Sequence, residues 1–159
     1  MSAFTSAEVK LRTLAQSNAA LQATLGTNPF RWYNRRLQQN VVAEVAPGAC
    51  VRVTRVTTMR ELNQGGIMNL TAIRFQVDCL DLDSETARAV ANDVIDFMGT
   101  INLCTNQQFD SPVTSISSNP TRLLNQTARM IPNPSNPNGP VYVESLDFRV
   151  WNIESLAIN

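Results

Sequence analysis

The amino-acid sequence predicts an α+β fold: a mainly antiparallel sheet with a long β-hairpin, packed against two helices at about residues 6–25 and 84–98. Three observations lead to this prediction. Residues 73–79 alternate between apolar and polar side chains, as a half-buried strand does. Gly65-Gly66 separates that segment from another one rich in β-branched residues, which is typical of a hairpin turn. Residues 84–98 carry apolar side chains at the spacing of an amphipathic helix.

The first helix is predicted from its cap and its periodicity. Thr5 followed by Glu8 forms a capping-box pattern, and Gly26 suits a helix end. Between them, leucines recur at helical spacing, at Leu11, Leu14, Leu21 and Leu25. We therefore expect one helix over residues 6–25, packed against the sheet.

The strands of the N-terminal half are predicted in order. After a turn at Thr27-Asn28-Pro29, a short aromatic strand is expected over residues 30–37, whereas residues 41–45 fit either a strand or a loop. Residues 50–59 are rich in valine and threonine and predict a strand. Residues 67–80 form its hairpin partner, across the turn at Asn63-Gln64-Gly65-Gly66.

The second helix begins in an acidic segment. Asp83 or Ser84 can cap it, and Glu85 is favourable near the positive end of the helix dipole. Gly99 ends the periodic pattern. The cluster of Asp78, Asp81, Asp83 and Glu85 lacks the glycine of a calcium loop, so helix capping is favoured over metal binding.

The C-terminal third gives weaker signals until its last strand. Short strands are possible at residues 103–109, 113–116 and 127–131. Residues 132–140 are rich in proline and asparagine and predict an exposed loop. Residues 141–153 predict a long final strand, in which Trp151 is either buried or at an interface. With 159 residues and no evident linker, we expect a single domain over residues 1–159.

The low charge content weakly favours an assembly component. Charged residues make up 16% of the chain, against roughly 25% in typical soluble domains. The formal net charge is zero, which argues against tight binding of nucleic acid. One local basic cluster, with Arg31, Arg35 and Arg36 beside Trp32 and Tyr33, fits either a solvated strand face with aromatic packing on its other side or a small contact site for an anionic partner.

The rare residue types argue against catalysis and against export. The chain has no histidine, which excludes Ser-His and Cys-His pairs, and Lys10 is its only lysine. The three cysteines match no zinc spacing, so we expect free thiols in a reducing cytoplasm. Met1–Glu8 does not resemble a signal peptide, and no apolar run is long enough to span a membrane. We predict that the protein is not an enzyme and needs no cofactor or metal.

The hairpin tip is the first candidate interaction site. Its apolar residues fit either an ordinary hairpin folded back onto the sheet or an arm that docks on a neighbouring subunit. The candidate residues for a subunit interface are Arg60, Glu61, Leu62, Asn63, Gln64, Ile67, Met68 and Trp151. The candidate residues for contact with another partner are Arg31, Trp32, Arg35 and Arg36.

The order of elements resembles that of the tail-completion, or tail-terminator, proteins of long-tailed bacteriophages. The matching features are an N-terminal helix, a Pro-aromatic strand, a strand–hairpin–strand unit, a helix and a closing strand. In this chain they lie at Pro29-Phe30, Val51–Met59, Phe75–Cys79, Ser84–Met98 and Asp147-Phe148-Arg149-Val150-Trp151. The resemblance covers most of the chain.

This resemblance implies a structural virion protein that forms a ring, commonly of six copies, on the finished tail tube. The ring ends tail growth and joins the tail to the head-completion complex. Its implied partners are further copies of itself, the tail tube protein and a head-completion or connector protein. DNA would pass through the lumen without specific binding, and the protein would be made in the host cytoplasm and reside at the head-proximal end of the tail. The alternatives are another connector component such as a stopper, a tail-tube protein or, more remotely, a small cytosolic enzyme.

Overall fold

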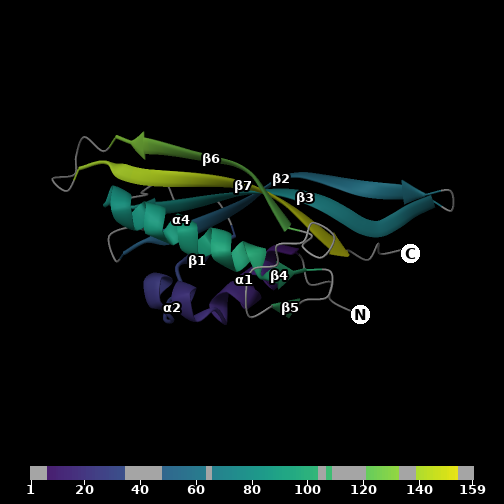
Figure 1. Cartoon of the computed structure of the whole chain (residues 1–159), viewed down its shortest axis with the longest axis horizontal. Helices are drawn as coiled ribbons and strands as arrows, with labels where there is room; N and C mark the ends of the chain where they lie inside the picture. The colour runs from purple at the N-terminus through teal and green to yellow at the C-terminus, as the bar shows by residue number, and fades with distance from the viewer. Residues whose placement is uncertain are drawn as a thin grey trace.

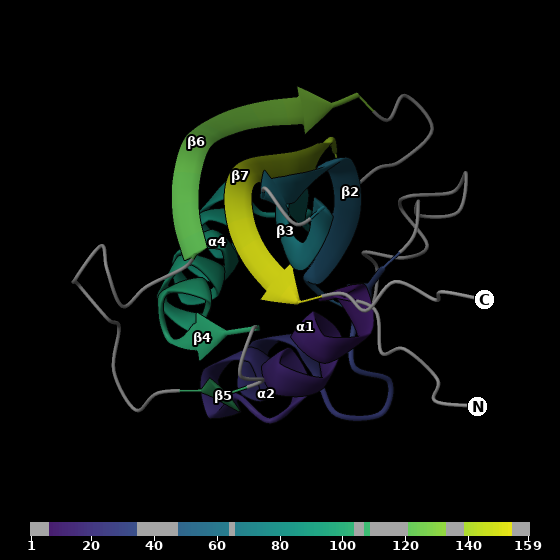
Figure 2. The same cartoon turned by 90° about the vertical axis from the view of Figure 1, so that its right-hand side faces the viewer.

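The computed structural model describes residues 7–34, 48–63, 66–103, 107–108, 121–132 and 139–153, with residues 60–63, 66–70, 102, 107–108 and 153 described by their backbone. A five-stranded sheet forms one layer, and helices cover one of its faces (Figure 1). Seen at right angles, the sheet is strongly curved, with β6 bending over its upper side (Figure 2). The α+β class predicted from the sequence is confirmed.

The sheet has the strand order β1-β2-β3-β7-β6. Only β1 and β2 run parallel among these neighbours, and the other three pairs are antiparallel. A separate two-stranded pair joins β4 to β5. The elements are α1 (Ala7–Gln16), α2 (Ala19–Leu25), β1 (Trp32–Tyr33), β2 (Cys50–Asn63), β3 (Gly66–Asp81), α4 (Ser84–Gly99), β4 (Ile101–Asn102), β5 (Gln107–Gln108), β6 (Thr121–Ile131) and β7 (Val141–Ile153).

The N-terminal helix is divided in two, which corrects the prediction of one helix over residues 6–25. The break lies at Ser17 and Asn18, and the Asn18 side chain accepts a hydrogen bond from Leu21 N at 3.1 Å. An asparagine at this position satisfies a free N–H of the first turn, so a new helix starts there. The predicted capping residue Thr5 lies outside the described residues.

Helix α4 and the two long strands of the hairpin confirm their predictions. Asp83 caps α4, since its carboxylate accepts from Thr86 N at 3.1 Å. Strands β2 and β3 pair from Cys50 and Leu80 out to Asn63 and Gly66 at the tip. The hairpin extends well past the helical layer in Figure 1, which leaves its outer part without a covering helix.

The remaining sequence predictions have mixed outcomes. Strand β7 has the bounds predicted for the final strand, whereas β6 begins at Thr121, six residues before the short strand predicted at 127–131. The aromatic strand predicted at 30–37 is observed as β1 alone, and residues 35–37 lie outside the described residues. So do 41–45, 113–116 and most of the proline-rich loop, residues 133–138.

The core lies between the helices and the facing side of the sheet. Strand residues that alternate along β2, β3 and β7 point into it, as do the apolar faces of α1, α2 and α4. Helix α4 packs on β3 and β7, and α2 packs on α4. No helix in the described part of the chain is long and apolar enough to cross a membrane.

Candidate functional site

The hairpin arm, residues 60–63 and 66–71, contains most of the predicted interface residues. The register places Leu62 opposite Ile67 and Arg60 opposite Thr71, with Met68 next to Ile67 along β3. The backbone of Leu62, Ile67 and Met68 therefore lies near the end of a projecting two-stranded ribbon (Figure 1). Gln64 lies outside the described residues.

Trp151, the remaining interface candidate, lies beside the base of the hairpin arm. It pairs with Ala72 of β3, and the last residue of β7, Ile153, pairs with Leu70. Its side chain is partly buried, and the Arg149 guanidinium lies 5.9 Å from the ring centroid. Trp151 and the arm thus belong to one continuous region of the sheet.

Two of the predicted partner-contact residues make contacts within the fold. Trp32 is 1% exposed, and its ring contacts those of Phe30 and Phe97 at centroid distances of 6.3 and 6.0 Å. The Arg31 guanidinium points inward and donates to the carbonyl oxygens of Ala49 at 2.8 Å and Thr24 at 2.9 Å. Arg35 and Arg36 lie outside the described residues.

Glycine makes room for this arginine. A Cβ at Gly48 would come within 2.8 Å of the Arg31 guanidinium, and one at Gly26 within 3.0 Å. Both residues also have positive φ, at 144° and 83°, a region that residues with side chains rarely adopt. Arg31 therefore ties the end of α2 to the start of β2.

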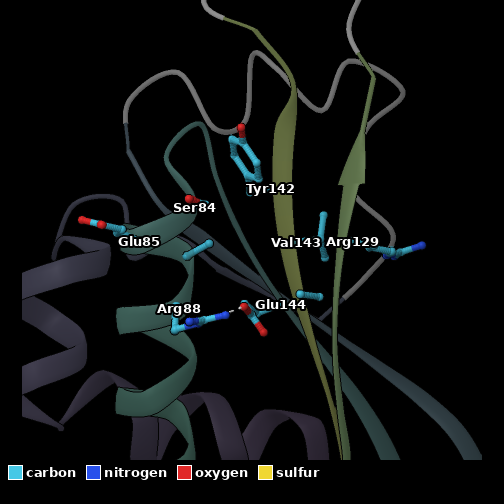
Figure 3. A pocket seen from close by; sticks show the side chains of 9 residues that line it. Ser84, Glu85, Arg88, Arg129, Tyr142, Val143 and Glu144 are labelled. Atoms are coloured by element: carbon cyan, nitrogen blue, oxygen red, sulfur yellow. Dashed lines mark ion pairs between the residues drawn. The ribbon is translucent and has the colours of Figure 1, made fainter.

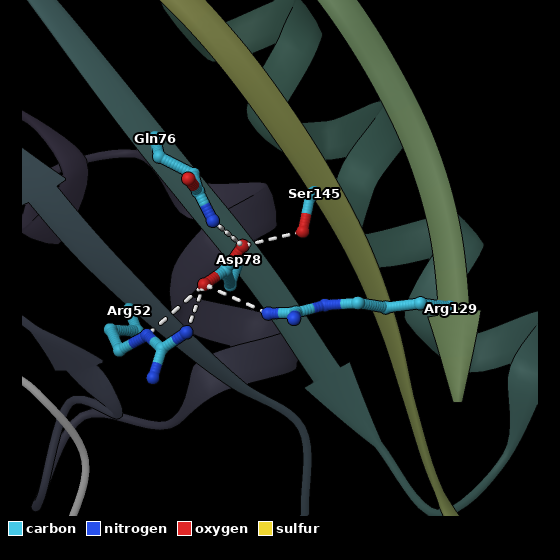
Figure 4. Close-up of polar contacts among 5 residues, drawn as sticks. All are labelled: Arg52, Gln76, Asp78, Arg129 and Ser145. Carbon is cyan, nitrogen blue, oxygen red and sulfur yellow. Dashed lines mark hydrogen bonds and ion pairs between the residues drawn. The ribbon is translucent and has the colours of Figure 1, made fainter. Parts of the chain in front are cut away.

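A buried carboxylate organises the open face of the sheet, by which we mean the face turned away from the helices. Asp78 is 0% exposed and accepts hydrogen bonds from Ser145 Oγ at 2.6 Å and Gln76 Nε2 at 3.0 Å (Figure 4). It also accepts from the Arg52 guanidinium, and Arg129 Nη2 lies 3.8 Å from it. Four neighbouring strands meet at this one side chain.

The electrostatics of Asp78 follow from these contacts. Burial raises the pKa of the carboxyl, but the hydrogen bonds from Ser145, Arg52 and Gln76 outweigh that effect and hold its pKa below the usual range. Asp78 is therefore charged at neutral pH. The sequence signal was the period-two pattern of polar residues on β3, although it does not reveal which cation on another strand would meet Asp78.

The open face of the sheet and the segment that contains α4 carry opposite charge, although the formal net charge of the chain is zero. By the strand register, five arginines share the open face with two aspartates: Arg52, Arg74, Arg122, Arg129 and Arg149 with Asp78 and Asp147. On the other side, the segment from Asp81 to Gly99 carries five carboxylates and one arginine. The net charge thus hides an uneven distribution.

A cavity of about 320 Å³ lies between α4 and the strands β6 and β7 (Figure 3). Arg88 and Glu144 form an ion pair across it, with Nε and Oε1 3.6 Å apart, and Gln126 also bonds Glu144. Side chains of mixed polarity line this space, and Tyr142 points into its upper part in Figure 3. Within the described ranges, no group of histidine, cysteine or carboxylate residues could hold a metal ion.

The comparisons with known proteins concern the fold. No family model and no curated protein matches the chain. Among solved structures, it is similar to a chain described as "Virion of native gene transfer agent (GTA) particle", with a TM-score of 0.59 and 14% sequence identity. The match covers 94% of this chain and 95% of that chain. At this level of identity the likeness shows that the two chains share a fold over nearly their whole length.

Proposed function

We propose that this protein is a structural virion component that forms a ring on the end of the tail tube, stops tail growth and joins the tail to the head-completion complex. The likeness of its fold to a chain of a gene transfer agent virion supports the role in a virion. The resemblance to tail-terminator proteins supports the more specific role, with a ring of six copies. The site of action is then the virion, at the head-proximal end of the tail.

The projecting hairpin arm is the observation on which this proposal rests. A ribbon that extends past its covering helices gains no support from its own core, so strand pairing that continues out to Asn63 and Gly66 is best explained by a neighbouring subunit. Identical subunits that each insert one segment into the next use a heterologous interface, which closes into a ring when the rotation per subunit allows it.

The mechanism is steric and needs no catalysis. A ring on the last layer of the tube occupies the surface that the next tube subunit would bind, and it presents a new surface to the head-completion complex. DNA passes through the lumen without specific contacts. The absence of histidine from the chain agrees with a structural protein.

The native mass of the purified protein, alone and mixed with tail tubes, tests the proposal. We expect a discrete ring, or a smaller species that binds only at tube ends, as seen by electron microscopy. Long polymers of the protein alone would instead indicate a tail-tube protein. A stable monomer that ignores tubes would contradict a role in the tail.

Substitutions at the arm test its role directly. We expect Ile67→Asp or Met68→Asp to abolish ring formation, because a charge at the tip cannot be desolvated in a subunit contact without a large cost. Ala89→Asp, on the exposed side of α4, adds the same charge and should leave assembly unchanged. Normal rings from both arm variants, measured by sedimentation, would refute the docking of the arm.

A further inference from the structure

Both edges of the main sheet are open over similar lengths in the described part of the chain. At one edge, the eleven residues of β6 (Thr121–Ile131) pair with β7 and with no other described strand. At the other edge, β1 covers only Val51 and Arg52 of β2. Within the described ranges, residues 53–63 of β2 pair with β3 and with no other strand. Residues 57–63 and 122–131 thus present backbone N–H and C=O groups that pair with no second strand among the described residues.

These same two strands carry nearly all the large apolar side chains that the described residues expose. Six such side chains are exposed, and five of them lie on β2 or β6: Val56, Met59, Leu123, Leu124 and Met130. Met59 is 68% exposed and Met130 56%. Apolar groups gathered on open strand edges, rather than scattered, indicate contact surfaces.

The two edges carry arginine and glutamate residues but no lysine. Edge strands are usually protected by free charges, and by lysine above all. The only lysine of the chain, Lys10, lies on α1. Arg55 of β2 is paired with Glu8, at 2.6 and 2.8 Å, and Arg129 of β6 reaches toward Asp78. The β2 edge is interrupted twice, at Val56 and at Glu61, and the β6 edge once, at Leu124; β6 is regular from Asn125 to Ile131.

We propose that the open edge of β2 in one copy of the chain pairs with the open edge of β6 in a second copy. The two edges are complementary because each supplies unpaired backbone groups, and the apolar side chains of both strands are covered together. The edges differ, so every bound copy presents one free edge to the next, as a ring requires. This inference rests on the proposed function in one respect: it specifies how the hairpin arm, which includes the outer part of β2, docks on its neighbour.

The test uses one variant for each edge. Met59→Asp disables the β2 edge and Met130→Asp the β6 edge, and both side chains are exposed, so the fold should persist. Val9→Asp is the matched control, because Val9 is the sixth exposed apolar residue and lies on α1. All four proteins, including the wild type, are compared by sedimentation velocity over concentrations up to about 1 mM, with association free energies read from the dissociation constants.

The proposal makes a distinctive prediction for mixtures. Each edge variant alone should associate about a hundredfold or more weakly than the wild type. An equimolar mixture should form a 1:1 heterodimer and nothing larger, because only one intact β2 edge and one intact β6 edge remain in each pair. The Val9→Asp control should assemble as the wild type does.

The pairing would be overturned by wild-type association that neither edge substitution weakens, by a mixture that stays monomeric, or by a wild type that is monomeric at about 1 mM. A Met59→Asp variant that still forms dimers would also overturn it, since that result indicates symmetric pairing of β6 with β6. Rings that assemble as expected but fail to bind tube ends would contradict the proposed function and leave the pairing intact. The two proposals therefore fail in distinguishable ways.

Discussion

At the scale of single residues, the polar network at Asp78 matters most for the sheet. Its carboxylate holds the Arg52 guanidinium from β2 and the Ser145 hydroxyl from β7, and Arg129 from β6 approaches within 3.8 Å. A buried charge is tolerated only when it is paired and hydrogen-bonded, and this one is both. The network therefore fixes the lateral register of four strands at one point.

We expect Asp78→Asn to lower the free energy of unfolding by about 3 kcal/mol at pH 7, because it leaves Arg52 without its counter-charge in a partly buried position. The loss should depend on pH. Since the pKa of Asp78 in the folded protein lies below the ordinary value of about 3.9, its contribution is complete above that pH and is lost as the pH falls through the lowered pKa. Urea unfolding at pH 7 and at pH 3 measures both effects.

Asp147→Asn is the matched control for this prediction. Asp147 pairs with Arg74 on the same face, but the Arg74 side chain is 49% exposed, so water screens the interaction. We expect a clearly smaller loss of stability than for Asp78→Asn. Equal losses at pH 7, or a loss for Asp78→Asn that does not shrink toward pH 3, would show that the network does not act through the buried charge.

At the scale of elements, the sequence predicts the strands and helices whose apolar side chains recur at a regular spacing. Strand β3, helix α4 and strand β7 each bury one face, so their apolar residues recur at a regular spacing. The break between α1 and α2 has no such signal, because it depends on the hydrogen bond between one asparagine side chain and Leu21 N. The sequence predicts only part of strand β6. Residues 122–130 are all exposed, so burial of one face does not impose an alternation of apolar and polar side chains on them.

The capping hydrogen bond at Asn18 can be tested. We expect Asn18→Ala to lower the free energy of unfolding by about 1 kcal/mol, the usual cost of removing an N-cap, because a first-turn N–H of α2 loses its partner. Asn18→Asp should retain most of the stability, since a carboxylate can accept the same bond. Thermal unfolding compares the three proteins, and a stable alanine variant would show that packing alone starts α2.

At the scale of the whole molecule, the candidate surfaces were only partly visible in the sequence. The hairpin arm was predicted because its turn and its tip residues are local features. In the sequence, the basic cluster at Arg31 and Trp32 is compatible with a surface patch. In the structure, Arg31 donates hydrogen bonds to backbone carbonyl oxygens and Trp32 is buried in the core. The open edges and the uneven charge depend on which strands are neighbours, and a linear pattern does not contain that information.

The arrangement of the molecule separates stability from assembly. The main buried cluster lies where helices cover the sheet, whereas the hairpin arm extends past that layer (Figure 1). We expect a variant in which Asn-Gly replaces residues 61–70 to keep the melting temperature within a few degrees, because the Arg60–Thr71 pair still closes the hairpin on a turn suited to two residues. Ring formation should be lost, because the tip and the outer part of the β2 edge are removed together. A shortened chain that unfolds at low temperature would make the arm part of the fold, and one that still forms rings would place the subunit contact elsewhere.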